Sequence, residues 1–279
     1  MTKPKISFLA FFLIWADIQG WKVPDFHALV CIFLENFYIK GRTALLMMPR
    51  GHSKSTILDV FNAWVIYCWP ETQILHQGTT DDDAYKCSNG TKLVLEKHPL
   101  CVDNPEVKRK KGETERWWVA GTDDVRYGTM LAKGILSGVT GHRAHFIQND
   151  DVETPKTTGS PEAREKLTYR LSEQTHIAFP GAKKLWIGTP HSHDSLYDKI
   201  KKLRKVDILV LKMFENEKRI ENALAGGKYL LDFEPIHAFA GIGQGAKYLS
   251  KGQDYTLKKV NDLYEVTLAQ DHYVADFYS

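Results

Sequence analysis

The sequence predicts an α/β fold in which a mainly parallel sheet lies between helices on both faces. Short apolar segments typical of buried strands alternate with longer segments of helical periodicity over most of the chain, and this alternation is the pattern of parallel strand–helix–strand units. The chain has 279 residues, of which 43% are hydrophobic and 25% are charged. This composition is that of a globular protein able to bury a sizeable core.

The N-terminal region predicts two helices, at residues 6–17 and 25–36, where apolar residues recur at helical spacing. The first segment follows two lysines and so has features of a short secretory signal. Its apolar run of about ten residues is too short to span a bilayer, and Asp17 and Trp21 follow it in place of a small-residue cleavage site. We therefore expect a buried amphipathic helix rather than a signal.

Apolar strands and the helices between them account for the middle of the chain. The turn-rich segment 104–130 suits a β-hairpin, and Pro70 ends the helix expected at residues 55–69. The expected strands are residues 43–48, 73–78, 144–150 and 183–190, and the expected helices are residues 55–69 and 81–97. Strands and helices in this order indicate parallel pairing.

We expect residues 1–205 to form the core domain with its N-terminal helical segment, and residues 206–279 to form its remainder or a linker subdomain. The sequence contains no internal repeat and no low-complexity linker. The last fifty residues, with Gly241, Gly243 and Gly245, give the weakest structural signal.

Charge and cysteine content narrow the class of protein only slightly. The net charge of +3 is too small to indicate nucleic-acid binding alone, but basic residues gather at 108–111 and 199–205. Such runs are more often solvated faces than binding sites. The four cysteines lie far apart with no Cys-x-x-Cys pair, so zinc and a disulfide framework are not expected and a reducing cytosol fits.

The segment "MMPRGHSKST", residues 47–56, concentrates phosphate-binding groups after the first expected strand. Lys54 and Ser55 stand where a phosphate-binding loop, G-x-x-x-x-G-K-[ST], carries its lysine and hydroxyl. Met48 and Ser53 occupy the two glycine positions, with Gly51 between them. The alternative interpretation is a helix N-cap by Ser53 beside an incidental lysine.

A second element favours the phosphate loop. In "HFIQNDDVE", Asp150 and Asp151 follow an apolar strand, with Glu153 two residues further on. A nucleotide-hydrolysing enzyme of this kind needs a carboxylate at a strand end for its magnesium ion. Paired acidic residues also cap helices, so the pair indicates a magnesium site only in combination with the phosphate loop.

Four segments, in this order, resemble the ATPase domain of the large terminase subunit of tailed bacteriophages, in its short-tailed-phage branch. "PRGHSKST" is similar to the deviant phosphate loop of that family, and "SGVTGHRAHFIQNDDVETP" to the segment leading into its magnesium strand. "LWIGTPHSHDSLYDKI" resembles its coupling motif, and "VPDFHALVCIFLEN" its adenine-side motif. The resemblance implies a P-loop NTPase fold of the ASCE type.

The resemblance also implies the cofactors ATP and Mg²⁺ and the residues that hold them. Ser55 and Asp150 would hold the metal, and His27 would lie on the adenine side. The nucleotide-binding loop would comprise Arg50, Gly51, His52, Ser53, Lys54, Ser55 and Thr56.

Catalysis and coupling follow from the same resemblance. Asp151 would polarise the attacking water, although most of the family has Glu there, so Glu153 is the alternative. Arg50 or Arg143 would stabilise the charge that develops on the γ-phosphate. Gly188, Thr189 and Pro190 would sense the γ-phosphate.

The function implied is a motor that couples ATP hydrolysis to movement of double-stranded DNA into a prohead. The expected partners are DNA, a homo-oligomeric ring of this chain on the portal protein, and the small terminase subunit, in the host cytoplasm and without a membrane. Nuclease activity is not expected, because the residues after the coupling motif, with Asp271 and Asp276, are too few for a complete nuclease domain. Two alternatives remain open: a helicase-like ATPase, and a catalytically inactive DNA-binding or assembly module.

Overall fold

The computed structural model describes residues 3–189, 195–211, 217–240 and 247–278. The chain forms two compact units, Met1–Leu211 and Lys212–Ser279. The first unit extends beyond the expected boundary at residue 205, because a strand at Val206–Val210 pairs in parallel with the strand at Thr43–Met47.

The first unit is built on an eight-stranded sheet with the order β3-β4-β5-β2-β6-β7-β1-β8. All pairs from β5 to β8 in this order are parallel, whereas β3 and β4 form an antiparallel hairpin at one edge. The strands are β1 (Thr43–Met47), β2 (Ile74–Gly78), β3 (Arg109–Gly112), β4 (Arg116–Val119), β5 (Met130–Gly134), β6 (Ala144–Asp150), β7 (Ala178–Gly188) and β8 (Val206–Val210). The expected parallel sheet and hairpin are therefore confirmed.

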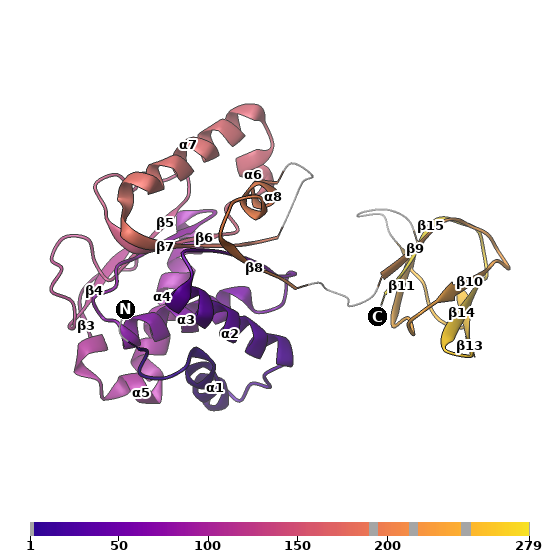
Figure 1. The fold of residues 1–279 in the computed structure, drawn as a ribbon, viewed down its shortest axis with the longest axis horizontal. Coiled ribbons are helices and arrows are strands. Elements are labelled where there is room, and N and C mark those ends of the chain that lie inside the picture. Colours follow the sequence, from indigo (N-terminus) through magenta and orange to yellow (C-terminus); the bar gives the residue numbers. More distant parts are fainter. Residues whose placement is uncertain (1–2, 190–194, 212–216, 241–246, 279) are drawn as a thin grey trace. The chain divides into compact units, whose positions relative to one another are not determined.

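Helices cover both faces of this sheet (Figure 1). The helices are α1 (Phe8–Ile18), α2 (Asp25–Lys40), α3 (Lys54–Cys68), α4 (Asp81–Lys97), α5 (Pro99–Val102), α6 (Pro155–Thr158), α7 (Pro161–Ile177) and α8 (Leu196–Lys201), with a 3-10 turn at Pro105–Val107. The helices α1 to α4 lie on one face, and α6, α7 and α8 lie on the other.

Alternation along the strands fills a separate core on each face. On β1, Ala44 and Leu46 belong to the aromatic-rich core under α1 to α3, whereas Leu45 and Met47 belong to the core under α7 and α8. The N-terminal helix α1 buries Phe8, Phe11, Phe12, Trp15 and Ala16, which confirms the buried amphipathic helix expected there. Among the described residues, no helix is both long enough and apolar enough to cross a membrane.

The second unit consists of β-strands with their own core. One sheet has the order β10-β14-β13 and the other has the order β12-β11-β15-β9, and all their pairs are antiparallel. The strands are β9 (Glu217–Ala223), β10 (Lys228–Leu231), β11 (His237–Ala240), β12 (Lys247–Tyr248), β13 (Tyr255–Val260), β14 (Leu263–Leu268) and β15 (His272–Tyr278). Leu249, Val266 and Phe277 are among the side chains buried between the two sheets.

Candidate nucleotide site

The candidate site lies where parallel strands of the first unit end. The first residues after β1, β2, β6 and β7 all come to this edge of the sheet, because the four strands run in the same direction. Ligand sites of open α/β sheets form at this carboxyl edge. The loop after β1 leads directly into α3, which begins at Lys54.

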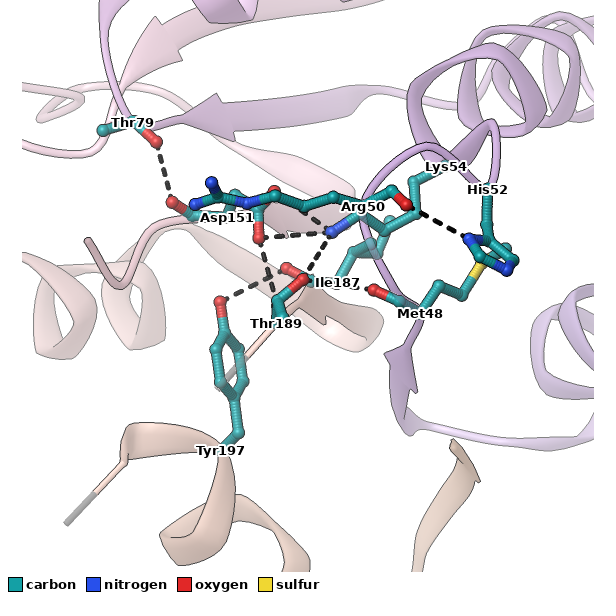
Figure 2. A network of polar contacts seen from close by, with 9 residues as sticks. All are labelled: Met48, Arg50, His52, Lys54, Thr79, Asp151, Ile187, Thr189 and Tyr197. Atoms are coloured by element: carbon teal, nitrogen blue, oxygen red, sulfur yellow. Dashed lines mark hydrogen bonds and ion pairs between the residues drawn. The ribbon is translucent and has the colours of Figure 1, made fainter. Parts of the chain in front are cut away.

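Lys54 connects its own loop to the segments after β6 and β7, which lie far away in sequence (Figure 2). Its Nζ donates to Asp151 Oδ2 at 3.2 Å and to Thr189 Oγ1 at 3.0 Å. The Lys54 side chain is only 9% exposed, against 39% for Asp151. A largely desolvated ammonium held by a carboxylate and a hydroxyl is a strong, geometrically defined anchor.

Asp151 is held by hydrogen bonds to residues at or just after the ends of the neighbouring strands β2 and β7. Its backbone N–H donates to Ile187 O at 2.9 Å, its carbonyl accepts from Thr79 Oγ1 at 2.7 Å, and its Oδ1 accepts from Thr189 N at 3.2 Å. Its φ is +45°, in the left-handed region that few non-glycine residues adopt. Such strain persists where the surroundings impose it, and it is frequent at functional sites.

The loop before α3 presents backbone amides instead of a side-chain cap. Gly51 and Ser53 have φ values of +80° and +61°, and among the described residues Ser53 makes no side-chain capping hydrogen bond. By contrast, Thr80 caps α4 and Ser160 caps α7. Ser53 therefore occupies the N-cap position of α3 without the side-chain hydrogen bond that a capping serine makes, and the helix N-terminus offers its first amides to an anion.

A cavity of about 520 Å³ opens beside this network, and side chains with oxygen atoms that can bind a metal ion line its walls. They include Ser55, Asp150, Asp151, Thr79 and Asp59. Burial raises the pKa of Asp150 to about 7; the Asp151 carboxylate adds to the rise, and Lys54 opposes it. A buried carboxyl beside a second carboxylate gains from a cation between them.

Glu153 points to a different part of the fold. Its Oε2 accepts from Ser195 Oγ at 2.6 Å and from Leu196 N at 3.0 Å, so it caps the N-terminus of α8. Glu153 is only 1% exposed. Of the two candidate catalytic carboxylates, Asp151 is the one that lines the cavity.

The two candidate arginines are also separated by the fold. Arg50 is exposed and lines the same cavity as Asp151, and Figure 2 shows its side chain extended across the site. Arg143 donates to His176 O at 3.0 Å and lines another cavity, of about 510 Å³, with Arg126 and Tyr169. Within one chain, Arg50 alone of the two is near Lys54.

A further cavity of about 460 Å³ also borders the loop and is lined by His27, Ser53, Thr56 and Trp21 among others. His27 packs edge-on against Phe12 and Phe26. Burial lowers its pKa, and its Nε2 is buried without a hydrogen-bond partner among the described residues. His52, the remaining loop residue, bonds the Arg50 carbonyl through Nδ1 at 3.2 Å.

The coupling segment follows β7 and lies against Lys54. Gly188 is needed there because a Cβ at that position would overlap the Tyr197 hydroxyl. Thr189 Oγ1 donates to Met48 O at 3.1 Å, so the residue touches both the phosphate loop and Asp151. Pro190 lies outside the described residues.

Thr79 and Asp59 are among the residues of the cavity that the sequence analysis does not identify. Thr79 follows β2 directly, and its place at a strand end was a usable signal. Asp59 lies four residues after Ser55 on α3, which puts both on one helix face. Helical spacing from Ser55 would have found it.

The donors present fit a magnesium ion bound with a nucleotide. Among the described residues, no three His, Cys, Asp or Glu side chains are arranged to hold a metal by themselves. Magnesium in phosphate-binding sites takes one or two protein oxygens and keeps water and phosphate oxygens as its other ligands. Ser55 and Asp150, which share the cavity, meet that requirement.

The strand order and the strand–loop–helix at Lys54 define an α/β domain with a mostly parallel sheet, which is consistent with the P-loop NTPase fold that the sequence predicts. The chain is 25% identical over 158 residues to the large terminase subunit of Enterobacteria phage T3, and the match spans 56% of this chain and 27% of that relative. This similarity confirms the resemblance to large terminase subunits that the motifs indicate.

The N-terminal domain of the DNA packaging ATPase from bacteriophage phi29 aligns with a TM-score of 0.43 and 13% identity, over 64% of this chain and 94% of that one. No family model matches the chain.

Proposed function

We propose that this chain is the ATP-hydrolysing motor domain of a viral DNA-packaging terminase, which couples hydrolysis of Mg-ATP to translocation of double-stranded DNA into a prohead. One observation carries the proposal: Lys54, Asp151 and Thr189 meet at the ends of three strands, beside a helix N-terminus that has no side-chain cap among the described residues. The similarity to a phage terminase subunit supports the DNA-packaging role.

Lys54 and the loop bind the phosphates in this proposal. The β- and γ-phosphates take the place of Asp151 as the partner of Lys54, because a polyanion offers the ammonium more negative charge than one carboxylate. The first amides of α3 and the hydroxyl of Thr56 hold the inner phosphates. His27 and its cavity receive the base.

Ser55 and Asp150 hold the magnesium ion. When bound, the ion neutralises charge on the phosphate oxygens as the terminal phosphoryl group leaves. The buried Asp150 carboxyl, with its pKa raised to about 7, must lose its proton to serve as a ligand.

Asp151, once released from Lys54, accepts the proton of the attacking water and orients it. Its fixed backbone and left-handed φ keep the carboxylate in place. Arg50 reaches the same cavity and stabilises the charge of the transferring group, a role worth about 10³–10⁵ in rate for an arginine finger.

Thr189 couples the chemistry to the rest of the fold. Because Lys54, Asp151 and Met48 all bond to it, a change of partner at Lys54 alters the contacts of Thr189. Gly188 and Tyr197 link this position to α8.

DNA is bound mainly through phosphate contacts. The candidates are the exposed basic strand β3 with Lys108, and the segment 199–205 at α8. Lys-rich edge strands also prevent sheet aggregation, so DNA binding must be measured. We further propose that the chain works in the host cytoplasm as a ring on the portal, together with the small terminase subunit.

The direct test is phosphate release from ATP by the wild type and by Lys54→Ala, with and without double-stranded DNA. The proposal predicts DNA-stimulated, magnesium-dependent turnover that Lys54→Ala abolishes. Turnover retained by Lys54→Ala would overturn the assignment of the loop. Complete absence of turnover in the wild-type ring would favour a catalytically inactive DNA-binding or assembly module.

A further inference from the structure

Asp59 is a third carboxylate on the metal side of the candidate site. It lies on α3 one helical turn after Ser55 and lines the same cavity as Ser55 and Asp150. The turn-by-turn repeat of the helix aims both side chains in the same direction. The function proposed above does not use it.

The environment of Asp59 is costly for a carboxylate that has only a packing role. Its Oδ1 is buried and has no hydrogen-bond partner among the described residues. Burial raises the pKa of Asp59 to about 8; the Cys87 thiol opposes the rise, and the Asp150 carboxylate adds to it. Buried polar atoms without partners are rare and indicate a missing ligand, ion or water.

The neighbouring helix makes room for this side chain. Gly90 lies in the interior of α4, where glycine is unfavourable by about 1 kcal/mol relative to alanine. A Cβ at Gly90 would overlap the carboxyl group of Asp59. The α3–α4 contact thus tolerates a poor helix former at a position that faces Asp59.

We propose that Asp59 is a positioning residue of the magnesium site, whose carboxylate accepts hydrogen bonds from water bound to the metal and so holds the ion between Ser55 and Asp150. This inference rests on the proposed nucleotide site. An outer-sphere role fits the residues, because no three described carboxylates or histidines converge tightly enough to ligate a metal directly. Magnesium keeps several of its waters when it binds.

The test is equilibrium binding of a fluorescent, non-hydrolysable ATP analogue during a magnesium titration. Asp59→Asn keeps the size of the side chain and removes the charge. We expect it to raise the magnesium concentration at half-saturation by about 10-fold to 100-fold, the usual effect of losing an outer-shell partner. Affinity for the analogue in EDTA should be unchanged.

Asp82→Asn is the matched control. Asp82 lies in the first turn of α4, is exposed and does not line the cavity, so its loss changes the net charge equally without changing the site. Gly90→Ala is the second variant: it keeps the carboxylate but displaces it, and it should shift the magnesium titration in the same direction. Gly90→Ala tests the same role of the carboxylate if Asp59→Asn fails to fold.

The outcomes separate the two proposals. If the wild type binds the analogue with magnesium and Asp59→Asn has the same magnesium dependence, the role of Asp59 is overturned and the nucleotide site stands. An equal loss of affinity with and without magnesium would also overturn it, because that result is a structural effect. If the wild type binds no nucleotide at all, the proposed function itself fails.

Discussion

Lys54 Nζ donates a hydrogen bond to Thr189 Oγ1 at 3.0 Å, across a separation of 135 residues in sequence. The contact joins the loop after β1 to the end of β7, and Asp151 closes the triangle from β6. In the proposed function, this bond connects the lysine that binds phosphate to a strand-end hydroxyl near helix α8.

Replacing Thr189 should separate coupling from binding. Thr189→Val keeps the volume but removes the hydroxyl that bonds Lys54 and Met48. We expect DNA-stimulated turnover to fall about 5-fold to 150-fold, the usual range of a coupling energy, with a smaller change in ATP affinity. Thr189→Ser should restore the stimulation. Equal stimulation in Thr189→Val and the wild type would contradict the role of this hydroxyl.

Asp151→Asn and Glu153→Gln should have different effects. Asp151→Asn removes the carboxylate in the cavity, so turnover should fall about 10²-fold to 10⁴-fold. Glu153→Gln should weaken the cap of α8 and lower the free energy of unfolding by about 1–3 kcal/mol, with little effect on turnover. Single-turnover kinetics and urea denaturation measure the two effects. A folded Glu153→Gln variant without turnover would reverse the assignment.

Arg50 and Arg143 can be told apart by the same kinetics in the isolated chain. Arg50→Ala should reduce turnover about 10³-fold or more with ATP still bound, because Arg50 lines the cavity of Asp151. Arg143→Ala should leave the turnover of the isolated chain unchanged, because Arg143 bonds His176 in another cavity. A large loss in Arg143→Ala with none in Arg50→Ala would sink this assignment.

Acid should destabilise the fold through His76. Burial lowers the pKa of His76 from 6.5 to about 4, and its Nδ1 lies 3.1 Å from Gln148 Oε1. Because the unfolded chain binds more protons between these two values, the free energy of unfolding falls as the pH drops from 6.5 toward 4. One group contributes at most about 1.4 kcal/mol per pH unit.

Urea denaturation across this pH range measures the effect. His76→Gln should flatten the dependence on pH, whereas His176→Gln, at an exposed position, should not. Parallel slopes for His76→Gln and the wild type would show that His76 does not carry the acid sensitivity.

Much of the first unit could be predicted from sequence because its signals are local. Apolar runs mark β1 and β6, and the helix after the loop begins at Lys54 itself. Parallel strands end at one edge, so the meeting of Lys54 with the Asp150–Asp151 pair follows from topology alone.

The choice between neighbouring carboxylates was beyond the sequence. Asp151 faces Lys54 because its left-handed φ turns the chain at that residue, and Glu153 is taken by Ser195, which is remote in sequence. The same holds for Arg143, whose partner is the carbonyl of His176.

The second unit escaped prediction for another reason. Its strands are short, and several have mixed exposure, as in Tyr255–Val260, where only Tyr255 is buried. Such strands carry weak alternation, and their pairing in two antiparallel sheets depends on contacts within the whole unit. The glycine-rich segment between β11 and β12 adds no periodic signal.

The most direct test of the central claim is a crystal structure of the chain with magnesium and a non-hydrolysable ATP analogue. The account predicts the terminal phosphate within hydrogen-bonding distance of Lys54 Nζ, with the metal between the Ser55 hydroxyl and Asp150. A nucleotide bound elsewhere, such as the cavity lined by Arg126 and Arg143, with Lys54 still held by Asp151 and Thr189, would contradict it.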